Sequence, residues 1–551
     1  MVIKINRAQK YIFNGLLLSI AAIAMRGVAV AFNVFVTSRV GAEGMGLLNL
    51  TQTVYGFSIT LATSGVNLAV VRLVSKALPY GNEGYFDKKS DRRVAKIMRN
   101  ALFYCLFFSV LSSLLLYSGA RIIGTYALGD TRTVSSLKIL AFTLTPISLS
   151  SALNGYFNAV RRVYKSVVVQ VCEQGAKITV VSALLMLIGP GGLEYACIAV
   201  VAGGAVSEAV CVIISATLYF FDRKIHKSQR FNIVKNCEKS STSSRIFNFN
   251  TLTKGCFIKF ASKGEQIQDS SIISIALPVA VSTYVRSALL TIEHLAIPWG
   301  LKRSGASATE ALSSYGVLHG MVLPILLFPS AVLGSFASLL IPELSSAQEQ
   351  GDTKRVNSIV SRVFFFSLLF SIGVSGIFVC YAQELGQLIY KSDEAAEYIK
   401  LLAPLIPLMY LDTAVDSMLK GLGEQLYTMR VNIADALISV ILVLTLLPGM
   451  GIGGYVVVIF LMELFNTSLS IIKLLNITKI KTPLAKWVLK PLLSVILATV
   501  VTRLLFNYDG IYNIFASLFN SRAVCFIEIF ICGLCYLLFA KVLSRKEIDT
   551  K

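Results

Sequence analysis

Long apolar runs recur along this sequence, and they constrain the fold more than any other feature does. A helix needs about 20 apolar residues to cross a bilayer, and fourteen runs approach or exceed that length. Hydrophobic residues make up 55% of the chain and charged residues only 15%, too much apolar surface for a soluble fold to bury. The sequence therefore predicts an all-α polytopic membrane protein. The expected spans are 11–36, 45–70, 98–118, 137–159, 166–188, 195–221, 271–297, 312–341, 359–381, 399–419, 429–447, 452–475, 488–506 and 523–543.

Lys and Arg are distributed unevenly between alternate loops. Of the 51 in the chain, 38 fall on the side of the N-terminus and 8 on the opposite side. Because positively charged loops stay in the cytoplasm, both termini are predicted to be cytoplasmic. These loops account for most of the net charge of +21. The expected partners are therefore anionic membrane lipids, and nucleic-acid binding is not needed to explain the charge.

The longest loop separates the first six runs from the next six. Residues 222–269 carry ten Lys and Arg against four acids, as is typical of a cytoplasmic linker. The short segment 257–260 is a candidate for lying on the membrane surface. We therefore expect one six-helix lobe at 1–221 and a second at 270–475. Two further helices and a short tail would occupy 476–551.

Polar residues interrupt corresponding helices of the two halves. Ser19, Arg26 and Asn33 share one face of the first run, and Arg286 and Glu293 repeat the same spacing in the seventh. An arginine at mid-bilayer depth costs about 2.5–3.5 kcal/mol on insertion scales, so it should face a wet cavity or a bundle interior. Arg286 and Glu293 are too far apart to pair along one helix, so they line a cavity or bridge to another helix. Two matching halves around a central site are a transporter design.

The first half holds three other ionisable residues inside its apolar runs. Glu173 and Lys177 are four residues apart with the acid first, the favoured order for a helical ion pair. They either neutralise each other for insertion or line the cavity. Glu208 is a candidate for ion coupling, and Arg26 has no such partner on its own helix. The forked donors of Arg26 suit an anionic group such as a pyrophosphate.

The second half holds more acids. Asp412 and Asp416 share one face of the tenth run. Two nearby carboxylates resist joint ionisation, so one could hold a proton or both could hold a cation. Lys420 lies four residues beyond Asp416 and offers an alternative partner. Asp435 and Glu463 are further coupling candidates, or else polar contacts between helices.

Prolines are expected to interrupt the seventh, eighth and tenth helices. A kink frees backbone groups, which is tolerated only beside protein or a wet cavity. Each kink is thus either a hinge for alternating access or an ordinary packing feature. The prolines are Pro278, Pro298, Pro324, Pro329, Pro404 and Pro407.

No signature of an enzyme is found. The three histidines lack the spacing of metal ligands, and there is no G-x-x-x-x-G-K-[ST] loop for ATP hydrolysis. The ten cysteines are scattered and do not form a disulfide framework. We therefore expect no cofactor and no metal. Transport would be driven by Na⁺ or H⁺ as the coupling ion, by the membrane potential or by the substrate's own gradient.

Four stretches carry a resemblance to a known family. They are GAEGMGLLNL, SGVNLAVVRLVSKA, LNGYFNAVRRVYKSVVVQVCEQ and YGVLHGMVLPILLFPSAVLGSFASLLIPELSSA. They resemble polysaccharide flippases of the multidrug/oligosaccharidyl-lipid/polysaccharide exporter superfamily. The branch that they are most similar to is that of stage V sporulation protein B, which is akin to the lipid II flippases.

The resemblance implies a V-shaped monomeric carrier of two six-helix lobes plus two helices. It would move a lipid-linked oligosaccharide or peptidoglycan precursor across the cytoplasmic membrane of a bacterium, in cell-wall or spore-cortex synthesis. Arg26 stands where lipid II flippases use a first-helix arginine in the cavity. Asn154 opens a stretch that reads R-G-Y-F-Q-G in the family, so one cation is lost. The expected cavity residues are Arg26, Asn33, Asn154, Glu173, Lys177, Arg286 and Glu293.

Two other functions fit the same sequence. A cation-coupled multidrug or small-molecule exporter of the same superfamily would use the acids of the second half. A scaffold for cell-wall or spore-coat assembly would transport nothing. The scaffold predicts that Arg26 is dispensable, whereas the flippase predicts that it is required.

Overall fold

The computed structural model describes seven segments of the chain, and every regular element in them is a helix. Eleven of these helices are long and apolar enough to cross a membrane. The all-α membrane fold expected from the sequence is thus confirmed. The described segments are 7–77, 88–160, 162–188, 191–241, 272–480, 484–507 and 521–548.

Two helices are too long for one crossing. α1 (Arg7–Thr63) has 57 residues and α15 (Gln425–Thr478) has 54, whereas about 20 residues span a bilayer. Each breaks at one glycine with a positive φ, 73° at Gly41 and 59° at Gly451. Residues with a Cβ rarely adopt this conformation. Each helix therefore contains two of the expected spans, the first and second in α1 and the eleventh and twelfth in α15.

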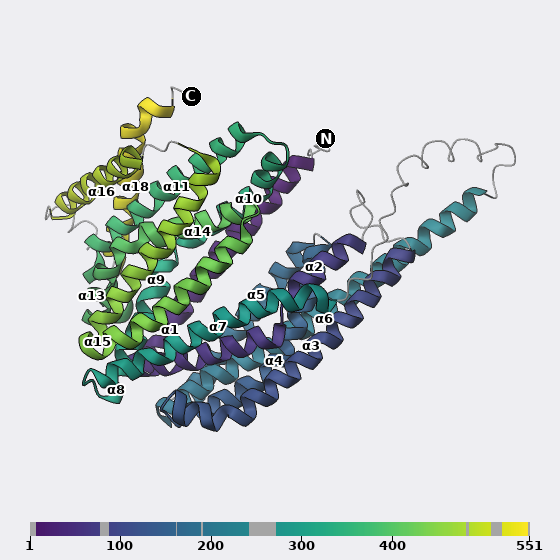
Figure 1. The fold of residues 1–551 in the computed structure, drawn as a ribbon, viewed down its shortest axis with the longest axis horizontal. Helices are drawn as coiled ribbons and strands as arrows, with labels where there is room; N and C mark the ends of the chain where they lie inside the picture. The colour runs from purple at the N-terminus through teal and green to yellow at the C-terminus, as the bar shows by residue number, and fades with distance from the viewer. Residues whose placement is uncertain are drawn as a thin grey trace.

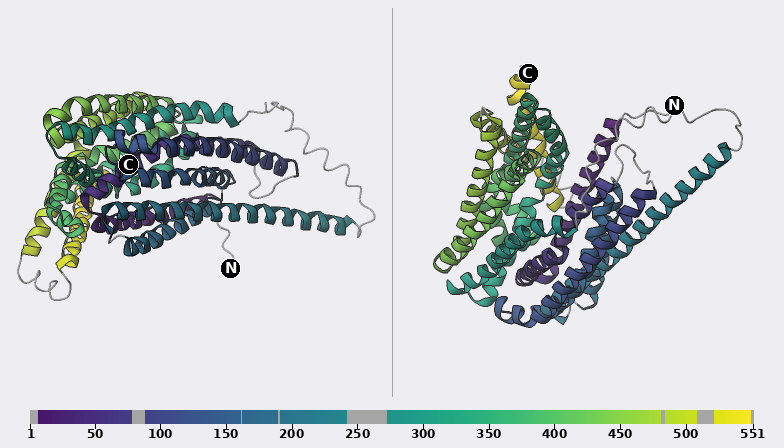
Figure 2. Two further views of the ribbon diagram at one scale, coloured as in Figure 1. Left: turned by 90° about the horizontal axis from the view of Figure 1, so that it is seen from below. Right: turned by 45° about the vertical axis from the view of Figure 1, so that its right-hand side comes forward.

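The first bundle follows the kink in α1. Within it α5 packs on α6, α3 on α4, and α4 on α6. α6 continues well past its neighbours (Figure 2), so the expected linker begins as helix, while its segment 257–260 lies outside the described residues. The helices are α2 (Val66–Ala77), α3 (Lys88–Ile122), η1 (Ile123–Ala127), α4 (Thr133–Ala159), α5 (Val163–Leu187) and α6 (Leu193–Ser241).

The second bundle is built around α7, α14 and α15, with α16 and α18 packed against α11 on its outside (Figure 1). The eighth membrane crossing of the chain consists of four helical pieces, α8 to α10, and the tenth consists of three, α13 to α14. The helices are α7 (Ile272–Arg303), α8 (Ala308–Tyr315), η3 (Gly316–Val322), α9 (Leu323–Leu327), α10 (Ser330–Glu349), α11 (Thr353–Cys380), α12 (Ala382–Leu385), η4 (Gly386–Tyr390), α13 (Asp393–Leu402), η5 (Ala403–Leu405), α14 (Ile406–Gly421), α16 (Leu484–Asn507) and α18 (Ser521–Ile548).

The prolines act as expected in two of the three helices. Pro324 and Pro329 lie where the eighth crossing is divided, and Pro404 lies in the short 3-10 segment η5 before α14. The seventh helix departs from the prediction, because α7 is continuous through Pro278 and Pro298. Each of these two prolines removes one backbone hydrogen-bond donor, and the helix continues on both sides of it.

The two bundles together form a V (Figure 1). They meet near α8 and the kink of α1, and they diverge toward the end where α1 begins and α18 finishes. Figure 2 shows the same divergence from another side. α1 and α7 lie between the arms and touch each other. A movement of one arm against the other would therefore change the contact between these two helices.

Candidate functional site

The closed end of the V is a contact between glycines of α1 and the π-helical segment η3. A Cβ on Gly46 would overlap the carbonyl oxygen of Leu312, and a Cβ on Gly316 would overlap that of Ala42. Only glycine lets two backbones approach this closely. The GAEGMG and YGVLHG stretches that carry the family resemblance are thus the surfaces that join the two arms.

Charged residues reinforce the same end. Arg132, in the turn before α4, pairs with Glu43 at 2.8 Å and with Asp130 at 2.6 Å. Partial burial opposes ionisation of Asp130, but the hydrogen bonds from Arg132 outweigh it and lower the pKa of Asp130. Lys302, at the end of α7, also acts electrostatically on Asp130. This turn of the first bundle therefore carries a stable negative charge facing a lysine of the second.

Arg26 and Asn33 have different environments although they share a helical face. The amide nitrogen of Asn33 donates to the carbonyl oxygen of Gly320 at 3.1 Å, which ties α1 to η3. Arg26 is exposed, and it lies near enough to Tyr410 of α14 to act on it electrostatically. No acid is recorded within ion-pair distance of Arg26 among the residues that the structure describes. Its guanidinium is therefore available to an external anion.

Four charged residues that the sequence placed on four expected spans come together in the second bundle, on α7, α14 and α15. One carboxylate oxygen of Asp412 and one of Asp435 are buried without a hydrogen-bond partner among the described residues. Arg286 acts electrostatically on both, and Glu463 lies within range of the same two acids. Buried charges are costly unless paired. Asp416 and Lys420 also act electrostatically on Asp412, so the cluster holds more acids than cations.

The other two predicted acids of the second bundle, Asp416 and Glu293, have near partners. Asp416 lies 3.8 Å from Lys420, the alternative partner that the sequence offered. Glu293 accepts a 2.6 Å hydrogen bond from Ser439 of α15. Arg286 therefore acts on the acids of α14 and α15. Glu293 is hydrogen-bonded to α15 as well, and Asp435 acts on it electrostatically.

In the first bundle, the predicted pair of Glu173 and Lys177 is not formed. The two side chains are both described, and no contact within 4.0 Å is recorded between them. Instead both lie within electrostatic range of Glu208 on α6, and Glu173 also acts on Cys211 of the same helix. Packing of α5 on α6 brings the residues together across helices. The i to i+4 spacing that suggested the pair does not decide the contact.

Asn154 lies near the end of α4, beside the start of α5. Its amide oxygen accepts a 2.8 Å hydrogen bond from Ser166, near the start of α5. This bond joins the end of α4 to the helix that follows. The asparagine that replaces the family's arginine thus ties two helices together.

A buried ion cluster that the sequence did not indicate lies at the same end of the first bundle. Asp222 of α6 is fully buried, and it binds Arg162, Lys165 and the hydroxyl of Tyr156. The three partners come from the NGYFNAVRRVYK stretch, which was noted only as a family motif. Arg162 and Lys165 indicated positive charge at the start of α5, but not the acid that they bind about 60 residues away.

The histidines of the second bundle form a second unexpected cluster. His294 bonds with the hydroxyl of Tyr315, and His319 with that of Tyr455, each at 2.9 Å. The centroids of the two imidazole rings lie 4.7 Å apart. The sequence spacing of the histidines gave no indication of this cluster, because their partners are tyrosines on other segments. Within the described residues, no group of three His, Cys, Asp or Glu is arranged to hold a metal ion.

Comparison with known families accounts for this arrangement. Residues 12–294 match the family described as polysaccharide biosynthesis protein, and this match covers just over half of the chain. The chain belongs to the polysaccharide biosynthesis protein family. Residues 305–445 of this family member match the MatE family as well. The division between the two matches falls close to the start of α8.

Individual relatives point to the same superfamily. Stage V sporulation protein B of Bacillus subtilis (strain 168) is 25% identical over 449 residues, covering 81% of this chain and 80% of that protein. The structure of the lipid II flippase MurJ in an inward closed conformation matches with a TM-score of 0.65 and 14% identity, covering 97% of this chain and all of that one. An inward-facing multidrug MATE transporter matches with a TM-score of 0.58 and 12% identity, covering 84% of this chain and all of that one. The chain therefore has the fold of the multidrug/oligosaccharidyl-lipid/polysaccharide exporter superfamily.

Proposed function

We propose that this protein is an alternating-access flippase for a lipid-linked oligosaccharide or peptidoglycan precursor. It would work in the cytoplasmic membrane of a bacterium with both termini in the cytoplasm. The similarity to stage V sporulation protein B supports a role in cell-wall or spore-cortex synthesis. The described state would be open toward the cytoplasm, because the arms diverge at the end of the termini and the basic α6 extension (Figure 2).

The observation that carries this proposal is the pair of exposed arginines on the two central helices. Arg26 of α1 and Arg286 of α7 lie within apolar helices, yet both are exposed. An arginine in such a helix must meet water or an anion. A pyrophosphate head group would supply the anion that these arginines need, because arginine binds phosphate oxygens through two parallel donors. The lipid chain of the substrate would stay in the bilayer.

The proposal is tested by replacing Arg26 with Ala and with Lys. The full chain is reconstituted into vesicles with a lipid-linked precursor, and arrival of the precursor in the opposite leaflet is followed with an enzyme that modifies only exposed head groups. We expect Arg26→Ala to lower the rate by about tenfold or more, the loss of one charge-assisted contact. Lys keeps the charge but loses the forked geometry, so its rate should be intermediate.

A matched control exists on the same helix. Arg39 is also exposed, but it lies over the ring of Phe35 near the outer turn. Arg39→Ala should leave transport unchanged. If Arg26→Ala flips the precursor as fast as Arg39→Ala and the parent, the proposed role of Arg26 fails. If the parent protein itself moves no precursor, the flippase proposal fails and a scaffold role gains support.

The acid cluster of the second bundle favours one alternative, a cation-coupled exporter of small molecules. The test is Asp412→Asn, which removes the ionisable group of an acid with an unpartnered oxygen. The alternative predicts loss of Na⁺- or H⁺-driven efflux of a cationic dye, with Arg26→Ala unaffected. In the flippase, Asp412→Asn should uncouple precursor transport from the ion gradient without changing head-group binding.

A further inference from the structure

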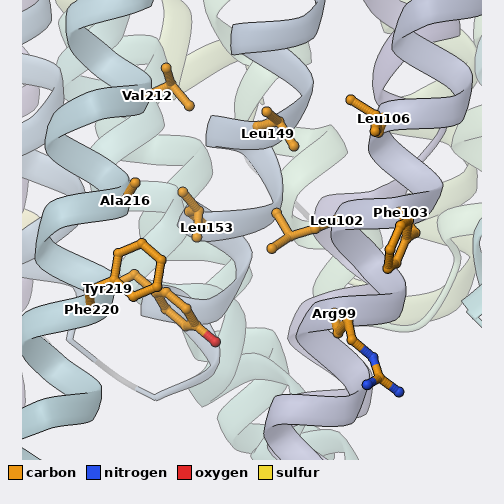
Figure 3. A pocket seen from close by; sticks show the side chains of 10 residues that line it. All are labelled: Arg99, Leu102, Phe103, Leu106, Leu149, Leu153, Val212, Ala216, Tyr219 and Phe220. Carbon is orange, nitrogen blue, oxygen red and sulfur yellow. The ribbon is translucent and has the colours of Figure 1, made fainter.

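A second site lies on the outside of the first bundle, away from the central helices. It is an apolar groove of about 380 Å³ between α3, α4 and α6. Figure 3 shows the side chains that line it. Leu149 and Leu153 of α4 lie at its centre, with α3 on one side and α6 on the other. The volume lies within the range of small-molecule sites, about 300–1,000 Å³. The lining is apolar throughout, except at one end.

That end is marked by Arg99 of α3 (Figure 3). Arg99 is the second residue of the expected span 98–118, at the end where the inner head groups are expected. Arg92, Lys96, Arg99 and Phe103 follow one another at spacings of four, three and four residues, and all are exposed. Such spacing puts them on one helical face. A single stripe of α3 thus changes from cationic to apolar where it enters the membrane.

The cations of this stripe are available to a ligand. Among the described residues, no carboxylate is recorded within ion-pair distance of Arg92, Lys96 or Arg99. The nearby Asp91 pairs instead with Arg223 of α6 at 3.4 Å. This pair also joins the two walls of the groove at the same end. The positive charge therefore stays uncompensated while the spacing between α3 and α6 is held.

The opposite wall is rigid. Tyr219 of α6 is buried, and its ring packs edge-on against Tyr156 with the centroids 4.9 Å apart. Tyr156 in turn is hydrogen-bonded to the buried Asp222. The small side chain of Ala216 keeps the groove open one turn along α6 (Figure 3). A preformed groove binds more tightly than one that must be ordered by its ligand.

We propose that this groove binds an anionic phospholipid of the inner leaflet. One acyl chain lies over Leu149 and Leu153, and the phosphate meets Arg99 and Lys96. Arg92 stands further along the same face for a second negative charge in the head group. Charge selects the lipid, because a zwitterionic phospholipid would place its own cation among these residues. The site is separate from the proposed transport path and does not rest on it.

Binding is measured on the full purified chain by native mass spectrometry, with phosphatidylglycerol and phosphatidylcholine offered separately. The protein should retain phosphatidylglycerol preferentially. Arg99→Gln should lower its apparent affinity about fivefold, the effect of one cation near a lipid phosphate. Ala216→Phe, which fills the groove, should lower retention of the acyl chain whatever the head group. Arg121→Gln, at the far end of α3, is the matched control and should change nothing.

Three results would overturn the proposal. One is equal retention of the two phospholipids by the unaltered protein. Another is unchanged phosphatidylglycerol binding in both Arg99→Gln and Ala216→Phe, each shown to be folded by its helical circular dichroism. The third is displacement of phosphatidylglycerol by a polyprenyl phosphate, which would assign the groove to the substrate's chain. Because transport is not the readout, the flippase proposal stands or fails independently.

Discussion

At the scale of single residues, the buried charges divide into those with partners and those without. Asp222 is enclosed by two cations and a tyrosine hydroxyl, whereas Asp412 and Asp435 each keep an oxygen without a partner in the described part of the chain. A satisfied charge fixes structure, and an unsatisfied one is free to change its protonation or bind an ion. The first type belongs to the framework of the protein and the second to its proposed mechanism.

Asp222→Asn tests the framework role. Removing one member of a buried ion cluster leaves its partners uncompensated, and the usual cost is about 3–5 kcal/mol of folding free energy. We expect the variant to show a clearly lower midpoint of thermal unfolding in detergent. The control is Glu343→Gln, because Glu343 pairs with Arg355 at 3.1 Å with both side chains nearly half exposed. Such a surface pair contributes about 0–1 kcal/mol. Equal loss in the two variants would contradict the prediction.

At the scale of elements, the contact of α1 with η3 depends on the absence of side chains. Gly46 and Gly316 let the two backbones touch, and Gly320 receives the amide of Asn33 from α1. The π-helical turn of η3 widens the helix at this point, as often happens at functional positions. A joint made by close backbone contact can separate and re-form without rearranging large side chains. We infer that this joint closes the outer side.

Gly316→Ala should open this joint. The added Cβ would overlap Ala42 and come within 2.6 Å of the amide nitrogen of Gly46. Overpacking of this kind costs about 1–3 kcal/mol. The expected results are a lower unfolding midpoint and greater labelling of an outer-side reporter cysteine. Gly204→Ala is the control, because a Cβ there meets no atom within 4 Å. A Gly316→Ala variant as stable and as closed as the parent would show that the contact is not decisive.

At the scale of the whole molecule, the V places α1 and α7 between the two arms. Thr60 of α1 lies against Ser287 of α7, with 3.3 Å between their hydroxyl oxygens, and Ser64 hydrogen-bonds with Tyr284. These contacts connect the two bundles between the joint and the diverging end. Alternating access would require some of them to break.

A double variant, Thr60→Cys with Ser287→Cys, tests that requirement. The two sulfurs should form a disulfide under mild oxidation, because the hydroxyls that they replace are already in contact. We expect the oxidised protein to lose most of its precursor transport and to regain it on reduction. The single-cysteine variants, oxidised in the same way, should keep their activity despite the native cysteines. Full transport by the cross-linked protein would show that α1 and α7 do not separate during the cycle.

The pattern of the sequence determined much of the fold. The apolar runs and the breaks at Pro324 and Pro404 were predictable. Each depends on local hydropathy or on the backbone of one residue. Helical spacing was less informative about contacts, as Glu173 and Lys177 show, because side-chain partners in a bundle come mostly from other helices. The histidine–tyrosine cluster was not predictable for the same reason.

The sequence by itself thus determined the class of the protein and its helices. It also identified the arginines within apolar helices, which need contact with water or an anion. Only the tertiary structure decided which charges meet. It brought Arg286 to the acids of α14 and α15, gave Asp222 its cations, and set Arg99 at the mouth of an apolar groove. The physical reason is the separation along the chain over which each effect acts. Hydropathy and backbone preferences act within a few residues, whereas electrostatic contacts depend on helix packing between segments far apart in the chain.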